Sequence, residues 1–131
     1  MKITLLEVIR GADAWKRLLA ANSANPAPAS DADYCLARIR FEYFARGTPG
    51  TCVHVLRPNQ FTAYSADGVE YEHPQVTVPN PVLAGSLKAG ESREGWVAFL
   101  IPKRDTKPLM NYSADIGAGT LHGGSGWFQL R

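Results

Sequence analysis

Residues 61–102 read FTAYSADGVEYEHPQVTVPNPVLAGSLKAGESREGWVAFLIP, and this stretch decides the fold. Asp67 and Gly68 stand between two β-prone runs, where an Asp-Gly pair is a strong signal for a tight hairpin turn. A second turn signal lies at residues 88–91, and the apolar run 95–101 follows it. Strands joined by short, punctuated turns are typical of antiparallel sheets, so the sequence predicts an all-β fold, an antiparallel β-sandwich.

The segment 34–44 shows the clearest strand pattern. Apolar side chains occupy every second position from Cys35 to Tyr43, whereas Arg38 and Arg40 occupy positions between them. Successive side chains of a strand point to opposite faces of its sheet. One face of this strand is therefore expected in the core and the other in water.

The run 95–101 differs because it is apolar on both faces, so another element must cover its second face. Residues 12–22 can supply this cover, since their apolar spacing is that of a short helix. The helical stripe consists of Trp15, Leu18, Leu19 and Asn22. We expect the helix to dock its aromatic ring onto the sheet. We also expect Trp96 to lie beneath Arg38 or Arg40 in a cation–π contact.

Three further segments complete the outline of the chain. Residues 22–33 are rich in Pro, Ala and Ser without periodicity and are expected to form a loop. Short strands are expected at 109–112 and at 127–130, the second with Phe128 turned inward. Between them, residues 115–126 hold five of the 12 glycines, which favours a long hairpin loop.

Two motifs of the opening stretch carry a resemblance to a known family. They are S-x-D-G-x-E-Y at 65–71 and L-x-x-G-E-S-x-E-G-W-V-x-F-L-x-P at 87–102. With matching pieces at 34–44 and 127–130, the chain resembles a bacterial extracellular domain of unknown function. That domain is telokin-like, an immunoglobulin-like sandwich related in fold to the immunoprotective secreted antigen of mycobacteria. The resemblance implies that residues 1–131 form one domain, an immunoglobulin-like antiparallel β-sandwich with one short N-terminal helix.

The same resemblance bears on location. The family is found on secreted proteins and lipoproteins, often behind a signal peptide, which implies an extracellular or cell-surface protein. Residues 1–8 do not have the pattern of a signal peptide. We therefore expect the export signal to lie outside this sequence. The alternative is a cytoplasmic protein that begins at Met1.

Size and charge limit the classes of partner. The chain has 131 residues, long enough to bury a core without metal or disulfide support. Its 14 basic and 12 acidic residues are interspersed and give a net charge of +2, so the charge pattern gives no case for nucleic acid. No apolar run approaches the ~18 residues of a membrane-spanning helix.

The two cysteines, Cys35 and Cys52, would permit one disulfide in an oxidising compartment. If 34–44 and 53–64 are strands on either side of a loop, Cys35 lies at the far end of its strand from Cys52. A disulfide needs the two Cα atoms within about 7 Å of each other. We therefore expect two buried free thiols.

No metal or cofactor site is expected. Asp31 and Asp33 could offer oxygen ligands to calcium, but the sequence around them lacks the central Gly and the later Glu of a calcium loop. A solvated entry to the next strand is the favoured interpretation. The spacing of the cysteines matches no zinc pattern. The glycine-rich segment lacks the Lys of a phosphate-binding loop and leads into a strand.

Catalytic activity is not expected either. His54, His73 and His122 could act as the base of a hydrolytic triad, but the chain has no Gly-x-Ser-x-Gly motif around a nucleophile. Glu70 and Glu72 share a strand face, yet a general acid–base pair needs a cleft, which an exposed strand does not offer.

These observations favour a non-catalytic extracellular or cell-envelope binding module. Loops at one end of a sandwich commonly carry binding residues. The candidate partner surface is accordingly His122 with Trp127, together with Arg38 and Arg40. The expected partner is a protein or glycan of the cell envelope, or a second copy of the chain. One alternative is a structural module that self-associates through exposed strand edges, and a third, less favoured class is a hydrolase.

Overall fold

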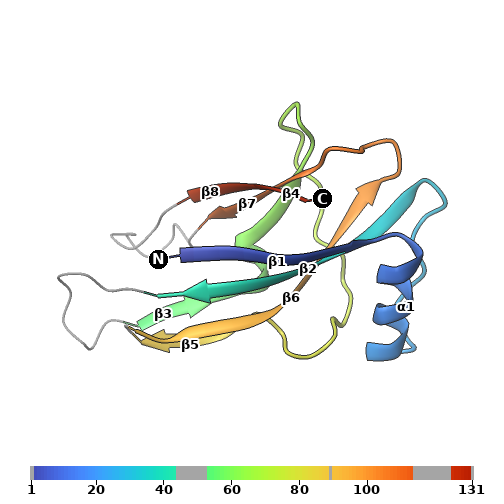
Figure 1. The fold of residues 1–131 in the computed structure, drawn as a ribbon. Coiled ribbons are helices and arrows are strands. Elements are labelled where there is room, and N and C mark those ends of the chain that lie inside the picture. The colour runs from blue at the N-terminus through green and yellow to red at the C-terminus, as the bar shows by residue number, and fades with distance from the viewer. Residues whose placement is uncertain (1, 44–52, 89, 114–124, 131) are drawn as a thin grey trace.

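The computed structural model describes residues 2–43, 53–88, 90–113 and 125–130 (Figure 1). The described chain is mostly β-strand, with one α-helix and one short 3₁₀ helix. The elements in chain order are β1 Lys2–Arg10, α1 Ala12–Ala21, β2 Ala32–Glu42, β3 Val53–Leu56, η1 Pro58–Gln60, β4 Phe61–Tyr64, β5 Gly85–Lys88, β6 Ser92–Pro102, β7 Leu109–Ser113 and β8 Ser125–Gln129.

The strands form three antiparallel groups, with orders β1-β2-β6, β3-β5 and β4-β7-β8. In Figure 1 the sheet β1-β2-β6 runs across the middle of the molecule, with β4, β7 and β8 above it and α1 packed at one end. Buried side chains from all three groups meet in one hydrophobic core, among them Phe41, Leu87, Phe99 and Tyr112. The prediction of an all-β chain with an N-terminal helix is confirmed.

The central strand β2 has the two-faced pattern that its sequence predicts. Its odd-numbered side chains from Cys35 to Phe41 are fully buried in the core, and Arg40 on the other face is exposed. The outer face changes along the strand, because Tyr34 and Leu36 are also buried there. The first half of β2 is thus covered on both faces and the second half on one.

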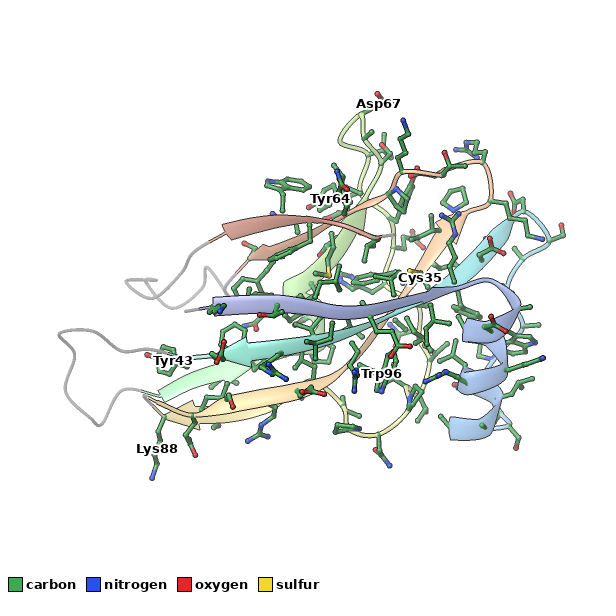
Figure 2. The ribbon with its side chains drawn as sticks, in the orientation of Figure 1. Cys35, Tyr43, Tyr64, Asp67, Lys88 and Trp96 are labelled. Atoms are coloured by element: carbon green, nitrogen blue, oxygen red, sulfur yellow. The ribbon has the colours of Figure 1, made fainter. Side chains whose placement is uncertain are left out.

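Helix α1 supplies the second cover, as expected. Its buried residues Ala14 and Leu18 pack with Leu36 of β2 and Trp96 of β6 in a second hydrophobic cluster. Figure 2 shows Trp96 on the side of β6 that faces α1. A strand that is apolar on both faces is stable only if both are removed from water.

The aromatic ring of the helix docks as expected, while one predicted core residue does not. Trp15 stacks on Tyr34, with ring centroids 5.7 Å apart and planes inclined by 20°. Leu19, predicted in the apolar stripe, is 38% exposed. The helix contacts the sheet along the line from Ala14 to Leu18, and one further residue turns the side chain by about 100° away from that line.

The cation over Trp96 is not the predicted one. Arg17 of α1 places its guanidinium carbon 5.5 Å from the centroid of the Trp96 ring. Arg38 and Arg40 instead contact Glu94, at 3.2 and 3.4 Å. The prediction named the wrong cation because Glu94 lies opposite Arg40 in the β2–β6 register and holds both guanidinium groups.

The hairpin turn at Asp67 is confirmed. Gly68 N–H donates to the Ser65 carbonyl at 3.0 Å, and Ser65 N–H donates to the Val69 carbonyl at 2.9 Å. Gly68 has a φ of 88°, which side chains disfavour. The returning arm is shorter than expected, since pairing with β4 ends soon after the bridge between Tyr64 and Glu70.

The segment 53–64 is also not one strand. It is β3, then η1 beginning at Pro58, then β4. Proline fixes φ and removes a backbone donor, so a ladder does not run through it. The strand before the break, β3, pairs with β5, and the strand after it, β4, pairs with β7.

Between the Asp67 hairpin and β5, residues 72–81 cross the molecule with no assigned strand. This crossing segment is tied to the end of α1 by Asn25, one of the buried polar residues. The Asn25 side chain donates to the carbonyls of Leu18 and Thr77 and accepts from Thr77 N–H, each at 2.8 Å. The loop 22–33 thus contains a specific anchor that its composition did not reveal.

Leu18→Ala should destabilise the protein by about 2–5 kcal/mol, because it opens a cavity between the helix and the sheet. The matched control is Leu19→Ala, which removes the same atoms from an exposed site and should change the free energy of unfolding by no more than about 0.5 kcal/mol. Urea unfolding followed by circular dichroism measures both. Equal effects of the two substitutions would contradict the described docking of α1.

Cys35 is a free and fully buried thiol, as predicted, while Cys52 lies outside the described residues. Burial raises the pKa of the Cys35 thiol to about 12. Because the thiolate is the reactive form, Cys35 in a Cys52→Ser variant should resist iodoacetamide at pH 8 in the folded state. It should be alkylated at the ordinary rate in urea. Rapid labelling of the folded variant, measured by mass spectrometry, would show that the thiol is accessible.

Candidate functional site

The histidines do not form a described catalytic group. His73 Nε2 lies 2.8 Å from the Phe61 carbonyl oxygen and 3.3 Å from Thr62 Oγ1, so its ring is attached to the start of β4. The backbone of His54 pairs with Leu87, and His122 lies outside the described residues. Within the described ranges, no cluster of three or more His, Cys, Asp or Glu side chains could hold a metal ion.

The acidic residues considered from the sequence have separate surroundings. Asp33 lies 3.5 Å from the Arg10 guanidinium, which accounts for it as a structural partner of β1. Glu70 accepts a hydrogen bond from the Tyr64 hydroxyl at 3.2 Å. Glu72 is exposed on the crossing segment. None of these contacts brings two carboxyl groups together.

The predicted partner residues lie on different sheets. Arg38 and Arg40 share Glu94 on the outer face of β2 and β6. Trp127, 57% exposed, projects from β8, and its ring meets that of Tyr64 edge-on at 5.1 Å. Figure 2 places Tyr64 beside β8 and Trp96 near α1, with the body of the molecule between them. The arginines and Trp127 are therefore two surfaces.

A groove that sequence reasoning missed lies beside β6. Its volume is about 510 Å³, within the range of roughly 300–1,000 Å³ that is common for ligand sites. Three elements form it: η1 with the residue before it, the crossing segment, and β6 with Val82. The lining residues are Arg57, Pro58, Asn59, His73, Pro74, Gln75, Val76, Thr77, Val78, Val82, Trp96, Val97 and Ala98.

The groove is apolar with a polar rim. Trp96 and Val97 are almost fully buried at its base, and Val82 is 39% exposed beside them. Asn59 and Gln75 are exposed polar residues of the lining. Arg57 and His73 are the basic groups of that lining, which contains no carboxylate. The arrangement suits a ligand with apolar parts and a negative or polar group.

One glycine explains why the groove ends at Trp96. At Gly95 an added Cβ would lie only 2.6 Å from the backbone nitrogen of Leu83, so the chain around Val82 can cross β6 there because Gly95 has no side chain. The contact is fixed by Trp96 N–H, which donates to the Pro81 carbonyl at 2.9 Å. Beyond this crossing, β6 borders the groove.

The sequence contains a weak signal for the groove. Residues 74–83 read PQVTVPNPVL, a run in which valines alternate with polar residues and prolines interrupt any ladder. Such a segment packs apolar side chains while leaving its backbone outside a sheet. The groove itself forms only because β6 and η1 lie opposite this segment in the folded protein. Such a contact between distant segments has no local sequence pattern.

A second concavity, of about 330 Å³, lies at the Asp67 hairpin. Tyr71 donates from its hydroxyl to Asp105 Oδ2 at 2.6 Å there, and Arg104 also lines the hollow. The pKa of Tyr71 is raised to about 12, first by desolvation and then by the hydrogen bond to Asp105. These contacts hold the hairpin against the turn after β6, a structural role.

The described helix is too short to cross a lipid bilayer, and none of the described residues forms a helix that could do so.

Comparison with known proteins finds a similar fold but no matching family. No family model matches the chain, and no curated protein matches it in sequence. Among solved structures, the chain is similar to YcdA from Bacillus subtilis, described as a candidate lipoprotein.

The match to YcdA has a TM-score of 0.66 at 15% sequence identity and covers 97% of this chain. It covers 35% of YcdA, so this chain spans about a third of that protein's length. A likeness at this identity shows a shared fold alone. The described antiparallel β architecture of this chain is thus that of one part of a larger bacterial protein.

Proposed function

We propose that this chain is a non-catalytic binding module of the bacterial cell envelope, built on an immunoglobulin-like β-sandwich. The observation that carries the proposal is the groove beside β6, an open site of about 510 Å³ with an apolar base and a polar rim. Natural ligand sites combine these features.

The chemistry of the lining favours binding over catalysis. His73 lies within hydrogen-bonding distance of the Phe61 carbonyl oxygen, and no thiol or carboxylate accompanies it in the described lining. Hydrolysis by a side-chain nucleophile needs a hydroxyl, thiol or carboxylate beside the base. The lining does contain the Thr77 hydroxyl, but its oxygen accepts a hydrogen bond from the Asn22 side chain at 3.2 Å and has no described bond to His73. The Cys35 thiol is buried in the core and has a pKa raised to about 12, so it does not serve as a nucleophile for a ligand in the groove.

The envelope location is supported by two likenesses. The sequence motifs resemble a telokin-like extracellular domain, and the fold is similar to part of YcdA, described as a candidate lipoprotein. Immunoglobulin-like sandwiches commonly serve as extracellular recognition modules, although a fold alone does not set a function. The partner is accordingly a protein or glycan of the envelope.

Self-assembly through strand edges is the second candidate function. The edge strands of the described sheets include β1 and β8. The β1 edge carries Lys2, Glu7 and Arg10, and its register with β2 shifts between Leu5 and Glu7. Charges and irregularities of this kind protect an edge against pairing. The exposed Trp127 of β8 is the specific observation that favours assembly there.

The groove should bind a ligand class that stabilises the folded protein. Thermal unfolding against envelope glycans, peptidoglycan fragments and peptides should identify at least one class that raises the midpoint by several degrees. At a hundredfold excess over its dissociation constant, a ligand specific for the folded state adds about 2.7 kcal/mol. Val82→Glu, which places a charge in the groove, should abolish most of the shift.

The matched control is Val69→Glu, since Val69 is 59% exposed at the Asp67 hairpin and outside the groove lining. It should leave the ligand-induced shift unchanged. A shift that both variants keep would place the ligand elsewhere. A flat response to the whole panel, with sedimentation showing reversible self-association that Trp127→Ala abolishes, would favour the assembly function.

A further inference from the structure

Strand β6 forms one edge of the sheet β1-β2-β6. Hydrogen bonds on either side of it show which of its residues face away from β2. Lys103 N–H donates to the Asp31 carbonyl on the β2 side, whereas Trp96 N–H donates to Pro81 on the other side. In an antiparallel pair the backbone groups of successive residues alternate between the two sides. Ala98 and Leu100, two and four residues after Trp96, therefore direct their N–H and C=O groups to the free edge.

These edge groups have no partner among the described residues. The hydrogen bonds of the described chain include none from Ala98 or Leu100 across that edge. Both residues are only partly buried, so solvent reaches them, and Ala98 lines the groove. An unpaired strand edge is a ready template for another strand. Here the template begins in the groove at Ala98 and continues past the lining at Leu100.

The opposite wall of the groove is a second extended backbone. Thr77 uses both its N–H and its carbonyl in the bonds to Asn25. Val76 and Val78 are half-buried, whereas Gln75 and Thr77 are exposed, the alternation of an extended chain. The backbone groups of Val76 and Val78 then point away from Asn25.

This wall is held in place at two points. Asn25 fixes Thr77 to the end of α1, and the contact of His73 with Phe61 fixes the other end of the wall to β4. Between the two anchors the crossing segment has no assigned strand and lies beside β6 without pairing with it. The space between the crossing segment and β6 is the groove.

We propose that an extended peptide segment of a partner protein occupies this groove as an added strand along β6. Its backbone bonds to the N–H and C=O groups of Ala98 and Leu100. Its alternate side chains enter the apolar base between Val82 and Val97. Strand addition of this kind takes affinity from the backbone and specificity from alternate side chains. The proposal deepens the proposed binding function and rests on it.

Two observations favour a peptide over the other occupants. The free groups are N–H and C=O pairs at strand spacing, which an extended peptide complements at every second residue and a glycan does not. The described lining includes basic Arg57 and His73 and no carboxylate, so the matching peptide carries an acidic residue beside its apolar ones. A second copy of the chain is less suited, because it would have to offer an unpaired acidic strand.

The test uses the full chain and defined peptides. Linear heptapeptides are selected on the immobilised protein from a displayed library, and the best are synthesised and titrated by calorimetry. Amide hydrogen exchange of the isotope-labelled protein is then followed by NMR with and without peptide. The N–H groups of Ala98 and Leu100 should exchange at least tenfold more slowly in the complex. Trp96 N–H, already bonded to Pro81, should change little.

N-methylation of the peptide gives a matched pair of ligands. Methylation at one set of alternate residues removes the donors that face β6 and should weaken binding at least tenfold. Methylation at the other set should have a smaller effect. Equal effects of the two sets, or exchange at Ala98 and Leu100 that the peptide does not slow, would overturn strand addition.

Failure of this inference is distinguishable from failure of the proposed function. If no heptapeptide binds while a glycan or small ligand stabilises the protein in a manner sensitive to Val82→Glu, the groove functions without strand addition. If the amides of Ala98 and Leu100 are slowed only as protein concentration rises, the occupant is a second copy and the partner peptide is ruled out. If neither peptides nor any ligand class responds to Val82→Glu, both proposals fail.

Discussion

The need to cover β6 on both faces organises the structure. Val97 and Phe99 pack into the core between the sheets, while Trp96 packs beneath α1. Full burial of a large apolar side chain contributes about 1.5–3 kcal/mol relative to leaving it exposed, so neither face can be left in water without a large loss of stability. The helix, the loop that carries Asn25 and the crossing segment together form the second layer that this strand requires.

The groove is where that second layer is incomplete. Near Gly95 the chain around Val82 lies directly on β6, and near α1 the helix covers the sheet. Between these two covers the crossing segment packs Val76 and Val78 against the same cluster without pairing with the strand. An edge that is neither paired nor blocked by charge is unusual in a stable protein. Its position inside a concavity protects it from unspecific pairing.

Local patterns predicted the parts of the fold that neighbouring residues control. The alternation in β2 assigned Cys35 to the core and Arg40 to the solvent. The Asp67 turn depends on a four-residue conformation that its own residues favour. The apolar residues on both faces of β6 required a cover, and the N-terminal helix was the remaining amphipathic element.

Contacts between distant segments escaped the same reasoning. Arg17 of the helix is the cation over Trp96, because the arginines of β2 are paired with Glu94. Asn25 gave no local signal, because its hydrogen bonds join residues up to 52 positions away. The groove follows from these tertiary placements. The predicted surface at His122 and Trp127 came from the general rule that loops at one end of a sandwich carry binding residues, and of that pair Trp127 is described.

The double anchoring of the crossing segment by Asn25 and His73 has a consequence for the energetics of recognition. A wall that is already fixed loses little conformational entropy when a ligand arrives, and rigid sites gain affinity by avoiding that cost. Association then needs no loop to close, so its rate is set by diffusion and orientation. Differences in affinity among ligands should therefore lie mainly in their dissociation rates, with the best ligand dissociating most slowly.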